Sequence, residues 1–204
     1  MLTKRRDWGR NCNQTCGLFE RMKLLTTSPQ TSTRQETLVK QAADTGPQSL
    51  LQNLVFNCID LSLLFKHCHW NVRGVMFKPL HDFLQTVYET LTDITDDVAE
   101  RQVIMGTPSS GLIAGVVAQT TMDPLPVKFL SPEEIVNELT DRLTQLVEQF
   151  NDAIRTEQNP VTGNMLQDMT ARLEKHLWML RSQKAEVEHA TKVALARAAV
   201  HLRG

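Results

Sequence analysis

The stretch LSLLFKHCHWNVRG, residues 61–74, decides the fold. In this stretch and in the residues before it, apolar side chains recur three and four residues apart, which is typical of a helix with one wide buried face. Cys58 and Cys68 lie within this pattern and are predicted core residues. Because Pro47 suits a first helical turn and Gly74 ends the pattern, we predict a helix from about residue 47 to residue 71.

The remaining pattern predicts three further helices, at about residues 78–105, 132–156 and 164–183, with a turn at 159–163. Ser131 and Glu134 form the capping-box pattern that starts a helix. The connection at 106–130 is long for a helix hairpin and holds an apolar run that could form a short helix. Such a connection indicates a crossover between parallel helices, so the predicted fold class is an all-α, ferritin-like four-helix bundle.

The 204 residues suit one domain with tails, and 41% hydrophobic residues are enough for a core. We predict a mobile tail at 1–45, the bundle at 46–183, and an extension at 184–204 that either lengthens the last helix or forms a separate one. The net charge of −1 argues against a general polycation, although the first 40 residues carry +5. No apolar run suits a membrane span and the N-terminus does not look like a secretory signal, so we expect a cytoplasmic protein.

The residues that could carry chemistry lie at the end of the first helix and along one face of the second. His81, Gln85, Asp96 and Glu100 fall within about 100° of one another on a helical wheel, and His69 lies near the turn between the two helices. His81 and Asp96 are roughly 22 Å apart along a helix, too far to reach one ion. Either these are two unrelated clusters, or two antiparallel chains share two equal sites across a two-fold axis. Imidazole and carboxylate ligands suit Fe²⁺ and also zinc.

Residue spacing alone leaves simpler interpretations open, because Asp96 and Glu100 could form a solvated face and His69 could be a surface residue. The combined motif is more specific. The run HWNVRG, residues 69–74, is followed by His81 twelve residues after His69, and then by Asp96 and by Glu100-Arg101. This resembles the Dps family, whose members carry HWN-x-[RK]-G, a second His at that spacing, and D-x-x-x-E-R. The resemblance spans roughly residues 48–183.

The resemblance implies a hollow shell of twelve subunits with ferroxidase centres at its two-fold interfaces. In such a centre, His69 and His81 of one subunit and Asp96 and Glu100 of another would bind iron. Fe²⁺ would be oxidised there, usually with hydrogen peroxide, and stored inside the shell as a ferric mineral. Many members of the family also bind DNA without sequence preference.

The sequence departs from the family at one ligand position. The family usually has Asp four residues after the second His, where this chain has Gln85. Because a neutral amide oxygen is a weaker ligand than a carboxylate, the second iron position is in doubt and zinc could compete for the site. His176 either supplies a further ligand, as in family members with a histidine-enriched centre, or packs between helices.

Three further features have two interpretations each. Trp70 either packs in the core or is an oxidisable group near the iron, and Arg101 either pairs with a carboxylate across the interface or is solvated. One face of the third helix is an acidic stripe, either ordinary surface or, as the resemblance implies, the lining of a three-fold pore that attracts Fe²⁺. The stripe consists of Asp141, Gln145, Glu148 and Asp152.

The basic N-terminal tail motivates a rival function. Lys4, Arg5, Arg6 and Arg10 are candidate DNA-binding residues, and twelve such tails on one particle would bind DNA by multivalency. The rival is a DNA-compacting structural protein with a weak or zinc-occupied metal site. The alternative for the tail is a disordered segment that only aids solubility.

Overall fold

Five helices follow one another along the part of the chain that the computed structural model describes, residues 49–201. Among these residues there is no strand, so the predicted all-α class is confirmed. None of the described helices is long and apolar enough to cross a membrane. The helices are α3 (Leu50–Asn71), α4 (Phe77–Ile104), α5 (Ile113–Gln119), α6 (Pro132–Thr156) and α7 (Pro160–His201).

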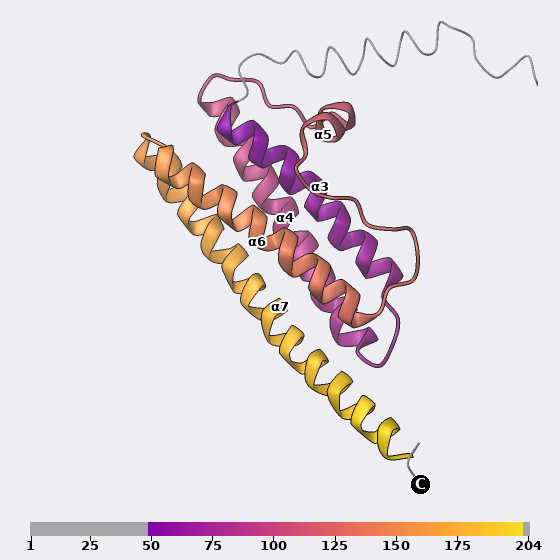
Figure 1. The fold of residues 1–204 in the computed structure, drawn as a ribbon. Helices are drawn as coiled ribbons and strands as arrows, with labels where there is room; N and C mark the ends of the chain where they lie inside the picture. Colours follow the sequence, from indigo (N-terminus) through magenta and orange to yellow (C-terminus); the bar gives the residue numbers. More distant parts are fainter. Residues whose placement is uncertain (1–48, 202–204) are drawn as a thin grey trace, which may run out of the picture. The chain divides into compact units, whose positions relative to one another are not determined.

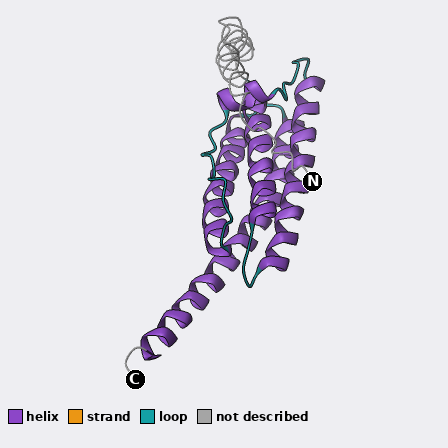
Figure 2. Ribbon diagram, turned by 90° about the vertical axis from the view of Figure 1, so that its right-hand side faces the viewer, coloured by secondary structure: helices purple, strands orange, loops and turns teal. Residues whose placement is uncertain are grey.

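The four long helices form a closed ring of neighbours, in which α3 packs against α4 and α6, and α7 packs against α6 and α4 (Figure 1). The end of α3 meets the start of α6, because the Arg73 N–H donates to the Leu130 carbonyl and the Leu130 N–H donates to the Asn71 carbonyl, both at 3.0 Å. The segment between α4 and α6 therefore runs back along the whole bundle (Figure 2). Helices α4 and α6 are parallel, as the predicted crossover requires.

The short helix α5 interrupts this crossover and packs on α3. A Cβ added to Gly115 would lie 2.9 Å from Cζ of Phe56, so only glycine allows this close approach. The segment after α5 is held by Asn57, whose side-chain oxygen accepts a hydrogen bond from the Thr121 N–H at 2.9 Å. The crossover is thus fixed to the outer side of α3.

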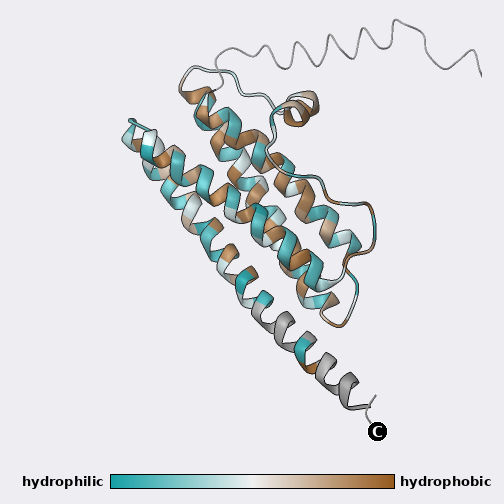
Figure 3. Ribbon diagram, viewed as in Figure 1, coloured by the Kyte–Doolittle hydropathy of each residue, from teal (hydrophilic) through white to brown (hydrophobic). Residues whose placement is uncertain are grey.

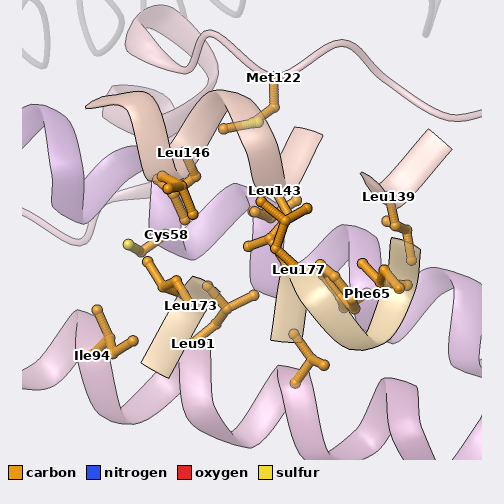
Figure 4. Packing of buried hydrophobic residues seen from close by; sticks show 14 of the residues in the cluster. Cys58, Phe65, Leu91, Ile94, Met122, Leu139, Leu143, Leu146, Leu173 and Leu177 are labelled. Carbon is orange, nitrogen blue, oxygen red and sulfur yellow. The ribbon is translucent and has the colours of Figure 1, made fainter. Parts of the chain in front are cut away.

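The core fills the space between the four long helices, where buried apolar side chains meet (Figure 4). Each of these helices alternates hydrophobic and hydrophilic residues along its length (Figure 3). Phe56, Phe65 and Phe150 are among the largest fully buried side chains. Cys58 and Cys68 are buried free thiols, as predicted, and burial raises the pKa of each to about 12. These thiols are therefore inert packing groups.

The helix ends agree with the sequence except at the starts of α3 and α7. Helix α3 begins at Leu50 rather than at Pro47, because the Ser49 hydroxyl caps it by accepting from the Gln52 N–H. The capping box at Ser131 is present, because its hydroxyl accepts from the Glu134 N–H and the Glu134 side chain accepts from the Ser131 N–H. The predicted turn at 159–163 is wrong, because α7 begins at Pro160. Asn159 caps this helix by accepting from the Val161 N–H at 3.0 Å, and Pro160 is well suited to the first helical position.

Helix α7 continues beyond the rest of the bundle as far as His201 (Figure 1). Residues 184–201 therefore lengthen the last helix rather than form a separate one. The predicted N-terminal tail at residues 1–45, with its candidate DNA-binding side chains, lies outside the described residues.

Candidate metal centre

His69 and His81 form a stacked pair at the turn between α3 and α4. Their ring centroids are 3.6 Å apart and the planes are inclined by 23°. Each ring is bonded to the backbone of the other residue: His69 Nδ1 lies 2.8 Å from the His81 carbonyl oxygen, and His81 Nδ1 lies 2.9 Å from the His69 carbonyl oxygen. Two histidines twelve residues apart are therefore held by reciprocal hydrogen bonds.

These hydrogen bonds decide which nitrogen is left for a ligand. A carbonyl oxygen only accepts, so Nδ1 carries a hydrogen in both rings, and Nε2 is the nitrogen that has a lone pair in the neutral ring. Burial, opposed in part by the bond to the His81 carbonyl, lowers the pKa of His69, which favours the neutral form. Histidines that bind metals in proteins usually donate their other N–H in this manner, and the bond fixes the ring.

Asp96 and Glu100 lie near the opposite end of α4 and are exposed. Among the described residues, neither carboxylate has a hydrogen bond or an ion pair. Asp96 lines a groove of about 500 Å³ between the outer faces of α3 and α4, and Ile59, Leu63, Tyr88 and Thr92 also line it. The groove thus extends from the carboxylate end of α4 to the middle of the helix.

The imidazoles and the carboxylates do not meet within one chain. No group of three or more His, Cys, Asp or Glu side chains in the described part of the chain could hold a metal ion. Since His81 and Asp96 are fifteen positions apart on one continuous helix, they are held roughly 22 Å apart. One chain therefore carries two separate groups of candidate ligands, one of nitrogen donors and one of oxygen donors.

Comparison with known proteins gives the family. The ferritin-like domain matches residues 48–190. The "DNA protection during starvation protein 2" of Deinococcus radiodurans is 30% identical over 161 residues, which cover 77% of this chain and 67% of that protein. This chain belongs to the Dps family.

Solved structures agree with this assignment. The crystal structure of a Dps protein from Deinococcus radiodurans matches with a TM-score of 0.63 and 29% identity, over 71% of this chain and 86% of that one. The Dps of Microbacterium arborescens, solved in its high iron form, matches with a TM-score of 0.64 and 23% identity, over 71% and 94% of the two chains. The second similarity concerns the fold alone.

Gln85, where Dps proteins usually have Asp, is engaged with two neighbours. Its side-chain oxygen accepts a short hydrogen bond from the Lys66 ammonium, and its amide donates to Glu89 at 2.6 Å. The oxygen that could act as a ligand is therefore already bound. The Lys66 ammonium also lies 4.8 Å from the centroid of the Tyr88 ring.

His176 lies in the contact between α7 and α4, away from the stacked pair. Its Nε2 is 3.0 Å from the Thr90 hydroxyl, which itself donates to the Thr86 carbonyl, so Nε2 carries the hydrogen. Its Nδ1 is buried with no hydrogen-bond partner among the described residues, and burial lowers its pKa. The side chain packs edge-on against Phe83, so its surroundings are those of a packed histidine.

Arg101 is hydrogen-bonded within this chain, whereas Trp70 is largely exposed. Arg101 ties α4 to the start of α7, with Nε donating to the Thr162 hydroxyl at 3.0 Å and Nη2 donating to Asn159 at 3.2 Å. Trp70 is 67% exposed, so the prediction that it packs in the core is wrong for the isolated chain.

The acidic stripe on α6 is continuous on the surface only in part. Asp141, Glu148 and Asp152 are exposed, and Asp152 is paired with Arg155. Gln145 instead donates to the Thr121 hydroxyl at 3.0 Å and so helps to hold the crossover. The free carboxylates at 141 and 148 remain the best candidates for attracting cations.

Two residues beside the site had no signal in the sequence that pointed to them. Lys66 and Tyr88 are ordinary members of amphipathic helices, and the packing of α3 on α4 brings Lys66 to both Gln85 and the Tyr88 ring. Their proximity could be inferred only if the register between the two helices were already known.

Proposed function

We propose that this protein is a ferroxidase and iron-storage protein, with Fe²⁺ as its substrate and with sites shared between two subunits. The reciprocal bonding of His69 and His81 carries the proposal. It holds both rings by Nδ1 and turns Nε2 away from these bonds, an arrangement that a purely structural histidine pair does not need. Zinc would fit the same nitrogen donors and is the competing occupant.

A second copy of the chain would complete the site. In an antiparallel two-fold pair of α4 helices, the His81 end of one helix lies beside the Asp96 end of the other. The groove on the outer face of α3 and α4 supports this, because Tyr88 and Thr92 in its wall lie about midway between His81 and Asp96. The axis would pass through the place where the surface is hollow and apolar. Twelve subunits arranged in this way would enclose a cavity, as in the family.

The proposed chemistry follows from the donor set. His69 and His81 supply nitrogen, while Asp96 and Glu100 of the second copy supply negative charge that balances the ion and favours Fe³⁺ over Fe²⁺. Two Fe²⁺ give two electrons to one hydrogen peroxide, which takes up two protons and leaves as two water molecules. Fe²⁺ would approach through pores lined by Asp141, Glu148 and Asp152, and the ferric product would mineralise inside the shell.

Mixing two inactive variants tests the shared site. One variant carries His69→Ala and His81→Ala, the other Asp96→Asn and Glu100→Gln, and each alone should not accelerate peroxide-driven Fe²⁺ oxidation. After dissociation and reassembly together, about a quarter of the sites regain all four ligands if pairing is random. Recovery of activity would establish sharing between chains. No recovery, with the mixed assembly formed, would refute it.

DNA protection is the second candidate function, favoured by the names of the relatives and by the +5 charge of the first 40 residues. Gel retardation by the full chain and by a variant with Lys4, Arg5, Arg6 and Arg10 changed to Gln would test it across a salt series. If the tail is the DNA-binding arm, the variant binds more weakly and its affinity depends less on salt. Equal binding by both proteins would exclude the tail.

A further inference from the structure

The number of electrons that peroxide reduction needs, together with Gln85, points to a further role for one side chain. This inference rests on the proposed function. Hydrogen peroxide takes two electrons, and each Fe²⁺ gives one. A second iron would need a ligand at position 85, where the Gln85 oxygen is neutral and already bound to Lys66. A site that holds one Fe²⁺ at a time would release hydroxyl radical unless another electron donor lay nearby.

Tyr88 is the best-placed oxidisable side chain. It is the only tyrosine of the protein, and it is half-buried against the core between α3 and α4. It shares the wall of the α3–α4 groove with the proposed ligand Asp96, and the Lys66 ammonium joins its ring to Gln85. It therefore lies between the two groups of proposed ligands on α4.

Distance supports this placement. Tyr88 is seven residues from His81 and eight from Asp96 on one continuous helix, which corresponds to about 10–12 Å. Electrons tunnel readily across such a span of packed protein. In the two-fold arrangement Tyr88 also lies near the axis, so one phenol would be within reach of both shared sites.

We infer that Tyr88 is the electron donor that completes peroxide reduction when the site holds a single Fe²⁺. Fe²⁺ and the phenol each give one electron to hydrogen peroxide. The phenolic proton and one proton from solvent accompany them, and the products are Fe³⁺, a neutral tyrosyl radical and two water molecules. A second Fe²⁺ with one proton then reduces the radical to tyrosine. The net reaction is the same as that of a two-iron site.

The neighbouring cation fits this role. A positive charge 4.8 Å above the ring disfavours a radical cation, so the electron leaves only together with the phenolic proton. The radical formed is neutral, and its ring is half-buried. Trp70 beside His69 is a poorer candidate, because it is 67% exposed and its radical would meet solvent.

The test uses the full assembled protein loaded anaerobically with one Fe²⁺ per site and then mixed with an equal amount of hydrogen peroxide. Freeze-quenched electron paramagnetic resonance should detect a tyrosyl radical in the wild type and in Trp70→Phe, but not in Tyr88→Phe. A hydroxyl-radical spin trap should give a severalfold larger signal with Tyr88→Phe. Because the chain has a single tyrosine, fluorotyrosine labelling should add fluorine splitting to the same signal without a substitution.

The outcomes separate the inference from the proposed function. Wild-type protein that oxidises Fe²⁺ at the site without a tyrosyl signal, and with the same spin-trap yield as Tyr88→Phe, overturns the role of Tyr88 alone. A tryptophanyl signal that disappears in Trp70→Phe would have the same meaning. If Fe²⁺ oxidation is no faster than in free solution, the proposed function and the inference both fail.

Discussion

The two ends of the α3–α4 hairpin carry the two halves of the proposed site, and their side chains lie in opposite surroundings. At the N-terminal end of α4, His69 and His81 are half-buried, stacked and hydrogen-bonded to the backbone. Toward the C-terminal end, Asp96 and Glu100 are exposed, with no bonds to other described residues. The nitrogen half is built by one chain alone, whereas the oxygen half awaits a partner.

This difference has a physical reason. Burial of a neutral imidazole requires little free energy when one nitrogen donates to a carbonyl, so the fold can orient such a ring before a metal binds. Two carboxylates one turn apart repel each other, and burying them without a cation would be costly. The two carboxylates are therefore more stable in water as long as no cation is bound beside them. The two halves should respond differently to mutation.

The largest expected effect is the loss of iron binding when either half is removed. His69→Ala with His81→Ala, or Asp96→Asn with Glu100→Gln, should weaken Fe²⁺ binding more than about 100-fold, since even indirect partners of metal ligands contribute about 10–100-fold. Anaerobic Fe²⁺ titration measures this affinity. Retention of tight binding by either variant would show that its half is not part of the site.

The same two variants should separate on stability. Removing the imidazole pair loses two hydrogen bonds and should lower the free energy of unfolding by about 1–3 kcal/mol. Neutralising the acid pair should change it by less than about 0.5 kcal/mol or raise it slightly. Urea denaturation at fixed protein concentration compares them. Equal losses would remove the distinction between a preformed and an open half-site.

Most of the fold could be predicted from the sequence, because helix periodicity, the Ser131 capping box and the long crossover are local signals. The start of α7 differs from the prediction because Asn159-Pro160 suits a helix start as well as a turn. The candidate ligands came from the Dps motif, and the helix rise predicted that they would not meet in one chain. Their hydrogen bonds, and the Lys66 contact with Gln85, depend on how α3 packs on α4 and could not be predicted.

A smaller effect is expected from Gln85→Asp, which gives the imidazole end a charged oxygen of its own. The added carboxylate should pair with Lys66 when no metal is present and strengthen binding of a second Fe²⁺ by about tenfold, or ~1.4 kcal/mol. Anaerobic titration would resolve the number of Fe²⁺ per site. Gln85→Asn is the matched control, since it shortens the side chain without adding charge. The same gain with Asn would rule out the charge as its cause.

Helix caps at opposite ends of the bundle allow a still finer comparison. Ser131 caps α6 beside the turn that follows His69, whereas Ser49 caps α3 beside Gln102 at the far end of α4. Each Ser→Ala change should destabilise the fold by about 1 kcal/mol. Only Ser131→Ala should also weaken Fe²⁺ binding slightly, because it loosens the segment that bonds Leu130 to Asn71 and Arg73. Thermal unfolding and titration of both variants would show whether support of the imidazole end is local.

The smallest effect should come from substitution of His176, because this residue changes the free energy of unfolding mainly at acidic pH. Its tautomer is the reverse of that in the stacked pair, with Nε2 bonded and Nδ1 buried without a described partner. Burial, with the nearby Lys175 and Arg172, lowers its pKa below 6.5, so the folded state binds fewer protons than the unfolded chain. Stability should be constant above pH 6.5 and fall as the pH drops from 6.5 through the folded pKa.

In His176→Phe, which keeps an aromatic ring beside Phe83, this acid-induced loss should shrink but not vanish. His69 also has a lowered pKa and contributes to the loss with the same sign. Urea denaturation of both proteins at several pH values between 7.5 and 5 measures the difference. An unchanged slope in the variant would mean that His176 takes up a second proton in the folded state as readily as in the unfolded chain. The Nδ1 atom of His176, which has no partner among the described residues, would then be hydrogen-bonded to a group outside this subunit.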